Sequence, residues 1–494
     1  MSEAALVAID QGTSSSRAMA FSTRGELLGV EQQSFESLYP APGWVEHDPE
    51  VLWATVLSTS RTLIGRLRAA GHRVIALGLT NQRETSIVWN RRSGAPIYSA
   101  IVWQDRRTAQ RCRELSLAGH EDLVAERTGL RLDPYFSATK LAWILDRVPG
   151  ARAAAQAGEL ACGTVDAFLL WRLTRGRSHL TDATNASRTA LYDIRQDRWD
   201  GALCELFGVP IGALPEVRDS AADFGTTDPE LYGEALPIRG VAGDQQAALI
   251  GQACLQPGDA KCTYGTGAFL VTNTGGRLVR SASQLIGTIA YRIGGRLTYA
   301  LEGSILSAGS VIRWLRDALG LYTRSEEVEA LAASVPDSAG VHLIPAFTGL
   351  GAPYWDPQAR AAILGLTPSS GRGEIARAAL DSVVFQTGDL IEAMTRDGVT
   401  PSLLKIDGGM ARNTLFCQLL ADMLGLDVLR PRMEEATAFG AACLAGLGLG
   451  VYGSLDEIAQ LWQVRQRYEP RLDPAARAQA MSAWHTALAR VRSP

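Results

Sequence analysis

Short apolar runs alternate along this chain with longer segments that have the apolar spacing of a helix. Residues 51–69 are such a helical segment. Apolar runs that predict strands stand on both sides of it, at residues 6–10, 19–21, 27–31, 74–80 and 86–90. Because this alternation is typical of sheets covered by helices, the pattern predicts an α/β protein.

The order of elements begins again in the second half of the chain. Residues 260–275 have the pattern of a strand, a turn rich in glycine and threonine, and a second strand, and residues 277–279 continue as the start of another strand. The opening of the chain has the same order about 250 residues earlier, which indicates a duplicated domain. A chain of 494 residues is also too long for a single core. We therefore predict two domains, residues 1–253 and 254–494.

The first strand ends in an acid followed by a turn of small hydrogen-bond donors. Asp10 closes the strand, Gly12 can adopt a positive φ, and residues 13–16 are a threonine and three serines. Arg17 adds a planar cationic fork suited to phosphate oxygens. Since Asp10 would repel a polyphosphate, this arrangement favours a nucleotide bound together with Mg²⁺. The alternative is an ordinary hairpin with a polar tip.

Two later segments extend the prediction of a nucleotide site. The second hairpin carries Thr266 between two glycines but has no acid, so it can hold phosphates through amides and hydroxyls. Further on, a strand ends in Asp407-Gly408-Gly409 ahead of a helical run at 415–424, and Asn413 between them can bind a base or ribose. A plain strand-to-helix turn is the alternative for that segment.

A third group of residues suits a small hydroxylated substrate. Arg83 and Glu84 follow a strand and can donate to and accept from hydroxyls, and Asp244 with Gln245 stands at a glycine turn after another apolar run. A carboxylate in reach of an alcohol can take its proton. Apolar walls for such a pocket are available, although core packing alone also accounts for aromatic residues: Trp103, Tyr135 and Phe269.

Composition excludes several other classes of protein. A net charge of −4 gives no support for binding to nucleic acid, and no run of 18 apolar residues is present for membrane insertion. None of the three lysines follows glycine and precedes serine or threonine, which excludes a P-loop. The seven cysteines form no metal-binding pattern and no export signal is visible, so we expect a cytoplasmic protein with reduced thiols. The Gly-x-Gly-x-x-Gly pattern at 448–453 follows no strand and is interpreted as a helix end and loop.

Taken together, these segments resemble the glycerol kinases of the FGGY carbohydrate kinase family. The resemblance runs from residue 5 to about residue 450. The string Thr80-Asn-Gln-Arg-Glu-Thr85 resembles the glycerol kinases rather than the pentulose kinases of the family. Further matching strings span residues 9–13, 42–49, 100–103, 133–137, 242–246, 263–267 and 345–356.

The resemblance implies two ribonuclease-H-like domains, of the actin and hexokinase type, with a catalytic cleft between them. It implies ATP-dependent phosphorylation of glycerol to sn-glycerol 3-phosphate with Mg²⁺, with Asp244 as general base assisted by Asp10 and Arg17. Asp10 and Asp244 would face the metal through its waters. The implied glycerol contacts are Arg83, Glu84, Trp103, Tyr135, Asp244, Gln245 and Phe269. The implied nucleotide contacts are Thr13, Ser14, Ser15, Arg17, Thr266, Gly309, Arg313, Gly409 and Asn413, where Arg313 replaces a glutamine of some members.

The same resemblance bears on regulation and on rival functions. The loop 228–237 lacks the Gly-Gly-Thr-Arg string of members inhibited by fructose 1,6-bisphosphate, and Glu230 stands where phosphorylated members carry histidine. The oligomeric state stays open, with a homodimer and a homotetramer as candidates. The rival interpretations are a kinase for another small polyol or ketose, and a nucleotide-driven switch of the actin and chaperone kind.

Overall fold

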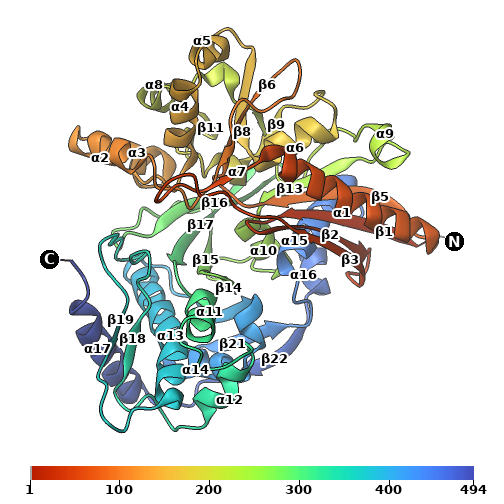
Figure 1. Ribbon diagram of the computed structural model, residues 1–494. Coiled ribbons are helices and arrows are strands. Elements are labelled where there is room, and N and C mark those ends of the chain that lie inside the picture. Colours follow the sequence, from red (N-terminus) through yellow and green to blue (C-terminus); the bar gives the residue numbers. More distant parts are fainter. Residues whose placement is uncertain (1–2, 494) are drawn as a thin grey trace.

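The computed structural model describes residues 3–493, which form two open sheets with helices packed against them (Figure 1). The first sheet has the strand order β13-β5-β1-β2-β3. Its strands are β1 (Ala4–Gln11), β2 (Ser15–Ser22), β3 (Leu27–Ser34), β5 (Arg73–Asn81) and β13 (Ile238–Gly243). The second sheet has the order β16-β17-β15-β14-β20-β21-β22. Its strands are β14 (Ala260–Tyr264), β15 (Ala268–Gly275), β16 (Ile286–Ile293), β17 (Arg296–Ile305), β20 (Leu403–Asp407), β21 (Asp427–Pro431) and β22 (Val464–Tyr468).

The two sheets repeat one topology. In the first, β1, β2 and β3 form an antiparallel meander, and β5 and β13 add to the other side of β1 in parallel. In the second, β14, β15 and β17 are antiparallel neighbours in the corresponding order, β16 pairs on the outside of β17, and β20 and β21 add in parallel beside β14. This repetition confirms the predicted α/β fold of two ribonuclease-H-like halves.

Helices cover both sheets. Long α1 (Pro49–Ala69) packs on β2 and β3, and α15 (Ala436–Leu449), although late in the chain, packs on β1, β5 and β13 of the first sheet. Contact of α15 with α10 (Asp244–Gly251) is very close: a Cβ on Gly440 would lie 1.8 Å from the carbonyl oxygen of Ala247. Only glycine fits there, which fixes α10, and with it Asp244, against the helix that follows Glu435.

Further elements build a lobe on each side of this centre (Figure 1). Above the first sheet lie β4 (Glu46–His47), β6 (Ser86–Asn90), β7 (Ala100–Ile101), β8 (Leu160–Thr164), β9 (Leu180–Asp182), β10 (Tyr192–Asp193), β11 (Arg198–Trp199), β12 (Glu216–Arg218), α2 (Ala109–Leu117), α3 (Glu121–Thr128), α4 (Ser137–Arg147), α5 (Ala151–Gln156), α6 (Val165–Leu173), α7 (Ala183–Ala186), α8 (Gly201–Phe207), η1 (Ile211–Ala213) and α9 (Pro229–Tyr232). Against or below the second lie β18 (His342–Ile344), β19 (Ala362–Leu364), η2 (Gly409–Arg412), α11 (Gly309–Asp317), α12 (Glu327–Ala333), α13 (Arg372–Arg396), α14 (Thr414–Leu424) and α17 (Pro474–Ala489). The short helix α16 (Leu455–Leu461) instead lies beside α15, and its Ile458 packs in one core with residues of β1 and β2.

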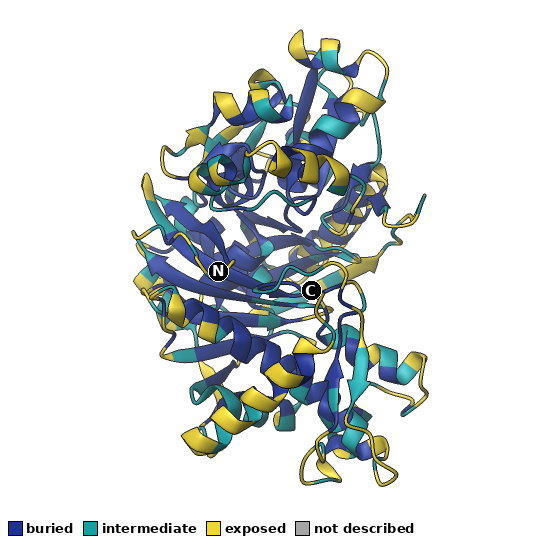
Figure 2. Cartoon of the chain, turned by 90° about the vertical axis from the view of Figure 1, so that its left-hand side faces the viewer, coloured by how far each residue is buried: buried dark blue, intermediate teal, exposed yellow. Residues whose placement is uncertain are grey.

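Burial follows this arrangement. Figure 2 shows the central strands almost wholly buried, whereas the outer helices expose one face. Along β1 every position after Ala4 is buried, so both faces of that strand are covered by protein. No helix within residues 3–493 combines the length and the apolar composition needed to cross a bilayer.

The structure departs from the sequence expectations at two strands. Residues 277–279 belong to a loop rather than to a strand, and the next strand is β16 at 286–293. A strand that the sequence pattern did not predict, β22, pairs with β21; its sequence is Val464-Arg-Gln-Arg-Tyr468, and all of it except Tyr468 is exposed. An edge strand of this kind has no continuous apolar run, which is why its pattern gave no signal.

One buried acid of the first half makes stability depend on pH. Asp166 on α6 accepts hydrogen bonds from the hydroxyls of Thr164 and Thr181, each at 2.5 Å. Burial raises the pKa of its carboxyl from 3.8 to about 7, against the opposing effect of the two hydroxyls. The folded protein therefore holds this proton more tightly than the unfolded chain.

We expect Asp166→Asn to change how stability depends on pH. An acid whose pKa is raised by folding contributes its full stabilisation of the folded state when the pH is below the pKa of the unfolded chain. That contribution is lost as the pH rises from about 4, the pKa in the unfolded chain, to about 7, the pKa in the folded protein. Between pH 5 and pH 8, the free energy of unfolding of the asparagine variant should thus rise relative to that of the parent by an amount on the order of 1–3 kcal/mol. Urea unfolding at the two pH values measures this difference. The matched control is Asp122→Asn, whose side chain is 92% exposed. An equal difference at both pH values would refute the assignment.

Candidate active site

An acid near the end of β1 is buried and bound to an arginine near the start of β2. Asp10 accepts from Arg17 at 2.9 Å, and the other Nη of Arg17 lies 2.9 Å from Glu435, just before α15. The turn between β1 and β2 is closed by the amide of Gly12, which donates to the carbonyl of Ser15. Ser15 and Arg17 are thus residues of β2, and the turn itself holds Thr13 and Ser14.

Parallel register brings Asp10 and Asp244 to one edge of the sheet. Asp10 is opposite Thr80 on β5, and Thr80 is opposite Ala242 on β13. The residues that follow these strand ends, including Arg83 and Asp244, therefore converge at the carboxyl end of the sheet, where ligands bind in open α/β sheets.

These two carboxylates also influence each other electrostatically. Burial raises the pKa of Asp10, the negative charges of Asp244 and Glu435 raise it further, and Arg17 opposes the rise. Residues 3–493 contain no cluster of three or more His, Cys, Asp or Glu side chains that could hold a metal ion by themselves. Two facing carboxylates, with the remaining ligands from water and phosphate, are the donor set that Mg²⁺ commonly takes. The residues fit the predicted ion.

Asp244 is the first residue of α10, and its side chain is 30% exposed. Its Oδ1 lies 3.2 Å from Nε of Arg83 and accepts a hydrogen bond from the backbone N–H of Gln245 at 2.7 Å. Both contacts fix the carboxyl group at the helix N-terminus while leaving its second oxygen outside these bonds. The carboxylate is therefore held in place and accessible, as a general base requires.

Arg83 and Glu84 belong to a buried cluster of four charges. Arg83 binds both oxygens of Glu302, at 2.6 and 3.0 Å, and Arg188 bridges Glu302 and Glu84, at 3.0 and 2.6 Å. All four side chains are at most 2% exposed. Burial alone would raise the pKa of Glu302, but the charges of Arg188 and Arg83 outweigh it and lower that pKa to about 2.

Glu84 is held in an unusual backbone conformation. Its φ of 56° lies in the left-handed region, which residues other than glycine rarely adopt. Its carbonyl accepts from the hydroxyls of Ser86 and Ser137, each at 3.0 Å. Because such strain persists only where the surroundings fix it, the backbone at Glu84 points to a functional position.

The three predicted aromatic walls lie together. Ring centroids of Trp103 and Tyr135 are 5.7 Å apart, those of Trp103 and Phe269 are 6.2 Å apart, and both pairs meet edge to face. The guanidinium of Arg83 lies 5.8 Å from the Phe269 centroid. The structure therefore joins these aromatic residues to the charged pair, with Phe269 supplied by the second half of the chain.

Trp103 also contacts the turn between β1 and β2. Its indole nitrogen donates to the hydroxyl of Thr13 at 2.9 Å. A residue predicted for the alcohol pocket and one predicted for the nucleotide site are thus directly bonded.

We expect Trp103→Phe to raise the KM for ATP as well as that for the alcohol. Loss of one neutral hydrogen bond costs about 0.5–1.5 kcal/mol, a factor of about 2–10 in each constant. Initial-rate kinetics with each substrate varied in turn would measure the effect. Leu38→Ala, an exposed site, is the control, and a variant with an unchanged KM for ATP would show that the Thr13 contact has no such role.

Gln245 is oriented by a lysine that sequence reasoning missed. The buried ammonium of Lys261 donates to Oε1 of Gln245 at 2.5 Å and to the hydroxyl of Thr263 at 3.0 Å. Burial lowers the pKa of Lys261, and the carboxylate of Asp407 opposes this. Because the amide oxygen of Gln245 is engaged, its NH₂ group is the end left to donate to a ligand.

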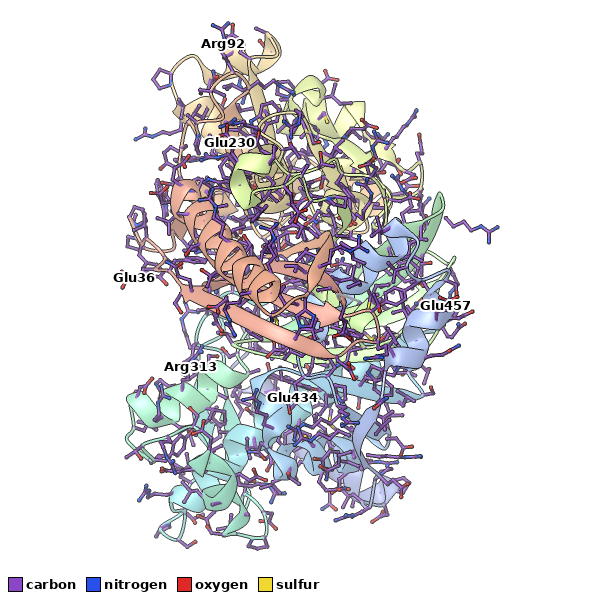
Figure 3. All side chains as sticks on the ribbon, turned by 90° about the vertical axis from the view of Figure 1, so that its right-hand side faces the viewer. Glu36, Arg92, Glu230, Arg313, Glu434 and Glu457 are labelled. Carbon is purple, nitrogen blue, oxygen red and sulfur yellow. The ribbon has the colours of Figure 1, made fainter. Side chains whose placement is uncertain are left out.

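On the second hairpin, Thr266, Gly309 and Arg313 come together. The backbone amide of Gly309 donates to the carbonyl of Gly265 at 2.9 Å. Arg313, at the surface of α11 (Figure 3), donates to the hydroxyl of Thr266, and this bond is 3.0 Å long. A Cβ on Gly309 would lie 2.5 Å from the carbonyl oxygen of Gly265, so only glycine allows this approach.

The strand end at Asp407 supplies the other predicted nucleotide residues. Gly409 begins η2, and a Cβ there would meet no atom within 4 Å, so the space beside it is open. Oδ1 of Asn413 accepts from the amide of Phe416 at 2.8 Å and caps α14. The side-chain NH₂ group of Asn413 is therefore the end that can donate to a ligand.

Arg188 and Glu302 are the main site residues that sequence reasoning missed. Glu302 is a lone acid within the apolar run of β17, and a buried charge in such a run is a usable signal. Arg188 stands in a polar stretch after α7 and carries no comparable signal. A separate groove of about 880 Å³ between α13, α14 and α17 includes none of the predicted site residues.

Comparison with known proteins places this architecture in a family. The profile of the FGGY family of carbohydrate kinases, N-terminal domain, matches residues 5–251, and that of the C-terminal domain matches residues 260–449. The chain belongs to the FGGY family of carbohydrate kinases. It is an FGGY kinase with the family's two domains in sequence, which accounts for the repeated topology of the two sheets.

Relatives of this FGGY kinase are similar over their whole length. It is 54% identical to a glycerol kinase of Rhodospirillum centenum, covering 99% of this chain and 98% of the relative, and 55% identical to glycerol kinase 1 of Pseudomonas aeruginosa, covering 99% of each. A crystal structure of Plasmodium falciparum glycerol kinase with ADP superposes with a TM-score of 0.94 at 34% identity, covering 100% of this chain and 99% of that one.

Proposed function

We propose that this FGGY kinase transfers the terminal phosphoryl group of ATP to glycerol, giving sn-glycerol 3-phosphate and ADP. The observation that carries the proposal is the grouping of Asp244, Arg83 and Glu84 beside three aromatic walls, next to the Asp10 turn. The full-length similarity to proteins described as glycerol kinases supports the same substrate.

In this proposal each polar group of the pocket has one task. Arg83 donates to alcohol oxygens, Glu84 accepts from hydroxyls, and the aromatic rings cover the carbon–hydrogen faces of the substrate. Asp244 accepts the proton of the attacking hydroxyl through its free oxygen. The NH₂ group of Gln245 donates to the bound alcohol.

The phosphate side needs charge neutralisation and exclusion of water. Asp10 and Asp244 would hold Mg²⁺ through its waters, and that ion would offset charge on the phosphates. Arg17 is available to phosphate oxygens once it leaves Asp10 and Glu435. Thr13, Ser14 and Thr266, with the amides around Gly309 and Gly409, would line the phosphates, and Asn413 and Arg313 the rest of the nucleotide.

A coupled assay of ADP release over a panel of polyols tests the proposal. Release should require glycerol, ATP and Mg²⁺ together, and chelation with EDTA should abolish it. A stronger response to dihydroxyacetone or a pentulose would assign another alcohol substrate. Hydrolysis of ATP at a rate that no alcohol of the panel changes would instead indicate a nucleotide-driven switch.

The cellular setting remains part of the proposal. All seven cysteines are buried and unpaired, which supports action in the reducing cytoplasm. We propose glycerol and ATP as the partners and a homodimer or a homotetramer as the assembly, and size-exclusion chromatography with light scattering distinguishes these two.

A further inference from the structure

Glu302 accepts hydrogen bonds from both arginines of the buried cluster, Arg83 and Arg188. It lies on β17, in the second half of the chain, whereas Arg83 and Arg188 come from the first half. Figure 1 shows β17 at the middle of the molecule, where the upper lobe meets the second sheet. The carboxylate is fully buried and accepts three charge-assisted hydrogen bonds, so the two halves are joined at this point by strong directional contacts.

These contacts extend across the alcohol pocket. From Asp244 the chain of bonded groups runs to Arg83 at 3.2 Å, on to Glu302, then to Arg188, and ends at Glu84 at 2.6 Å. The proposed base and the proposed hydroxyl acceptor are therefore connected through Glu302. Any displacement of Glu302 moves both arginines that fix those two carboxylates.

Arg188 has features of a residue that is held for position. It is fully buried, its Nη1 has no hydrogen-bond partner within the described residues, and its guanidinium lies 5.6 Å from the Tyr135 ring centroid. Leaving a buried donor unbonded is costly. The two remaining nitrogens bind Glu84 and Glu302, so Arg188 acts on the pocket through those acids.

The C-terminal end of β17, just after Glu302, supports the second phosphate hairpin. Ser304 pairs with the wall residue Phe269, and Ile305 pairs with Ala268. Gly267 approaches the same strand so closely that a Cβ there would lie 2.5 Å from the carbonyl oxygen of Ile305. Just beyond the strand, the amides of Ala308 and Ser310 donate to the carbonyl of Thr266. Glu302 is thus three residues from the backbone that shapes the phosphate hairpin.

We propose that Glu302 and Arg188 are positioning residues that couple occupancy of the alcohol pocket to the placement of the second phosphate hairpin. Alcohol bound by Arg83 and Glu84 stiffens the arginines, these fix Glu302, and β17 then holds Thr266 where the nucleotide binds. The inference rests on the proposed function, because it assumes that an alcohol and a nucleotide occupy these two sites. It makes the binding of one substrate strengthen that of the other.

The test measures this coupling directly in the full-length protein. Calorimetry gives the Kd of a non-hydrolysable ATP analogue with Mg²⁺, with and without saturating glycerol. In the unmodified protein, glycerol should tighten binding by about 5-fold or more. In Glu302→Gln the ratio of the Kd without glycerol to the Kd with glycerol should fall toward 1, and the KM for glycerol should rise by about 10-fold or more. Arg188→Lys keeps the charge and one of the bonds, so it should give an intermediate ratio.

Controls separate positioning from general stabilisation. Asp389→Asn alters another buried carboxylate of the second half, one that binds Trp484 and His485 on α17, and it should keep the full ratio. Circular dichroism shows whether each variant folds. If Glu302→Gln does not fold, the Kd ratio of Arg188→Lys tests the inference in its place, and a ratio equal to that of the unmodified protein would contradict it. A folded variant with unchanged coupling and KM for glycerol, or an unmodified protein without coupling, would overturn the inference. Absence of glycerol-dependent ADP release in the unmodified protein would instead refute the proposed function.

Discussion

Asp244→Asn is expected to lower kcat by a factor of about 10²–10⁴, or about 3–5 kcal/mol in the barrier. The amide keeps an oxygen for Nε of Arg83, at 3.2 Å from Asp244 in the present structure, so the pocket should keep its shape. What is lost is the group that takes the alcohol proton. Steady-state kinetics should therefore show a large fall in kcat with much smaller changes in the affinities for glycerol and ATP.

The matched control for this variant is Asp223→Asn. Its carboxylate is 69% exposed and pairs with Arg239 at the surface, so turnover should stay close to that of the parent. If Asp244→Asn also turned over at a near-normal rate, Asp244 would lose its assignment as the base.

Arg83→Met is expected to cost about 3–5 kcal/mol in the free energy of unfolding, together with most of the activity. Removing one partner of a buried ion pair leaves its charge uncompensated, and Arg83 supplies two of the three bonds to Glu302. Urea unfolding of the two proteins at pH 7 gives the difference. Arg83→Lys should recover part of the stability, because an ammonium restores the charge but not the bidentate fork.

Arg106→Met provides the comparison at an exposed ion pair. Arg106 binds Asp133 with its side chain 46% exposed, so its loss should cost below about 1 kcal/mol. Equal destabilisation by the two substitutions would contradict the account of the buried cluster.

Much of this site follows from sequence because strand ends carry it. Asp10, Arg83 and Asp244 each stand within two residues of the end of a strand, and parallel pairing of β1, β5 and β13 brings such positions to one edge. The prediction that the second hairpin repeats the first is confirmed by the strand order of the second sheet. The residue roles themselves stay predictions, since they depend on where the substrates bind.

The rest depends on contacts between residues far apart in the chain. Glu302 lies 219 positions from Arg83, and Lys261 meets Gln245 only because β14 lies beside α10. Local spacing carries no record of such pairs. The strand predicted at 277–279 is wrong for a similar reason. These residues lie in the loop before β16, and their short run of two apolar residues does not distinguish a loop from a strand.

The central claim is that two halves of the chain present a magnesium-bound triphosphate to an alcohol beside Asp244. A crystal structure with glycerol, Mg²⁺ and a non-hydrolysable ATP analogue tests it most directly. The account predicts a terminal glycerol oxygen within hydrogen-bond distance of Asp244 and in line with the outermost phosphorus, between the Thr13 and Thr266 turns. Nucleotide bound away from both turns, or glycerol without a carboxylate beside its terminal oxygen, would contradict it.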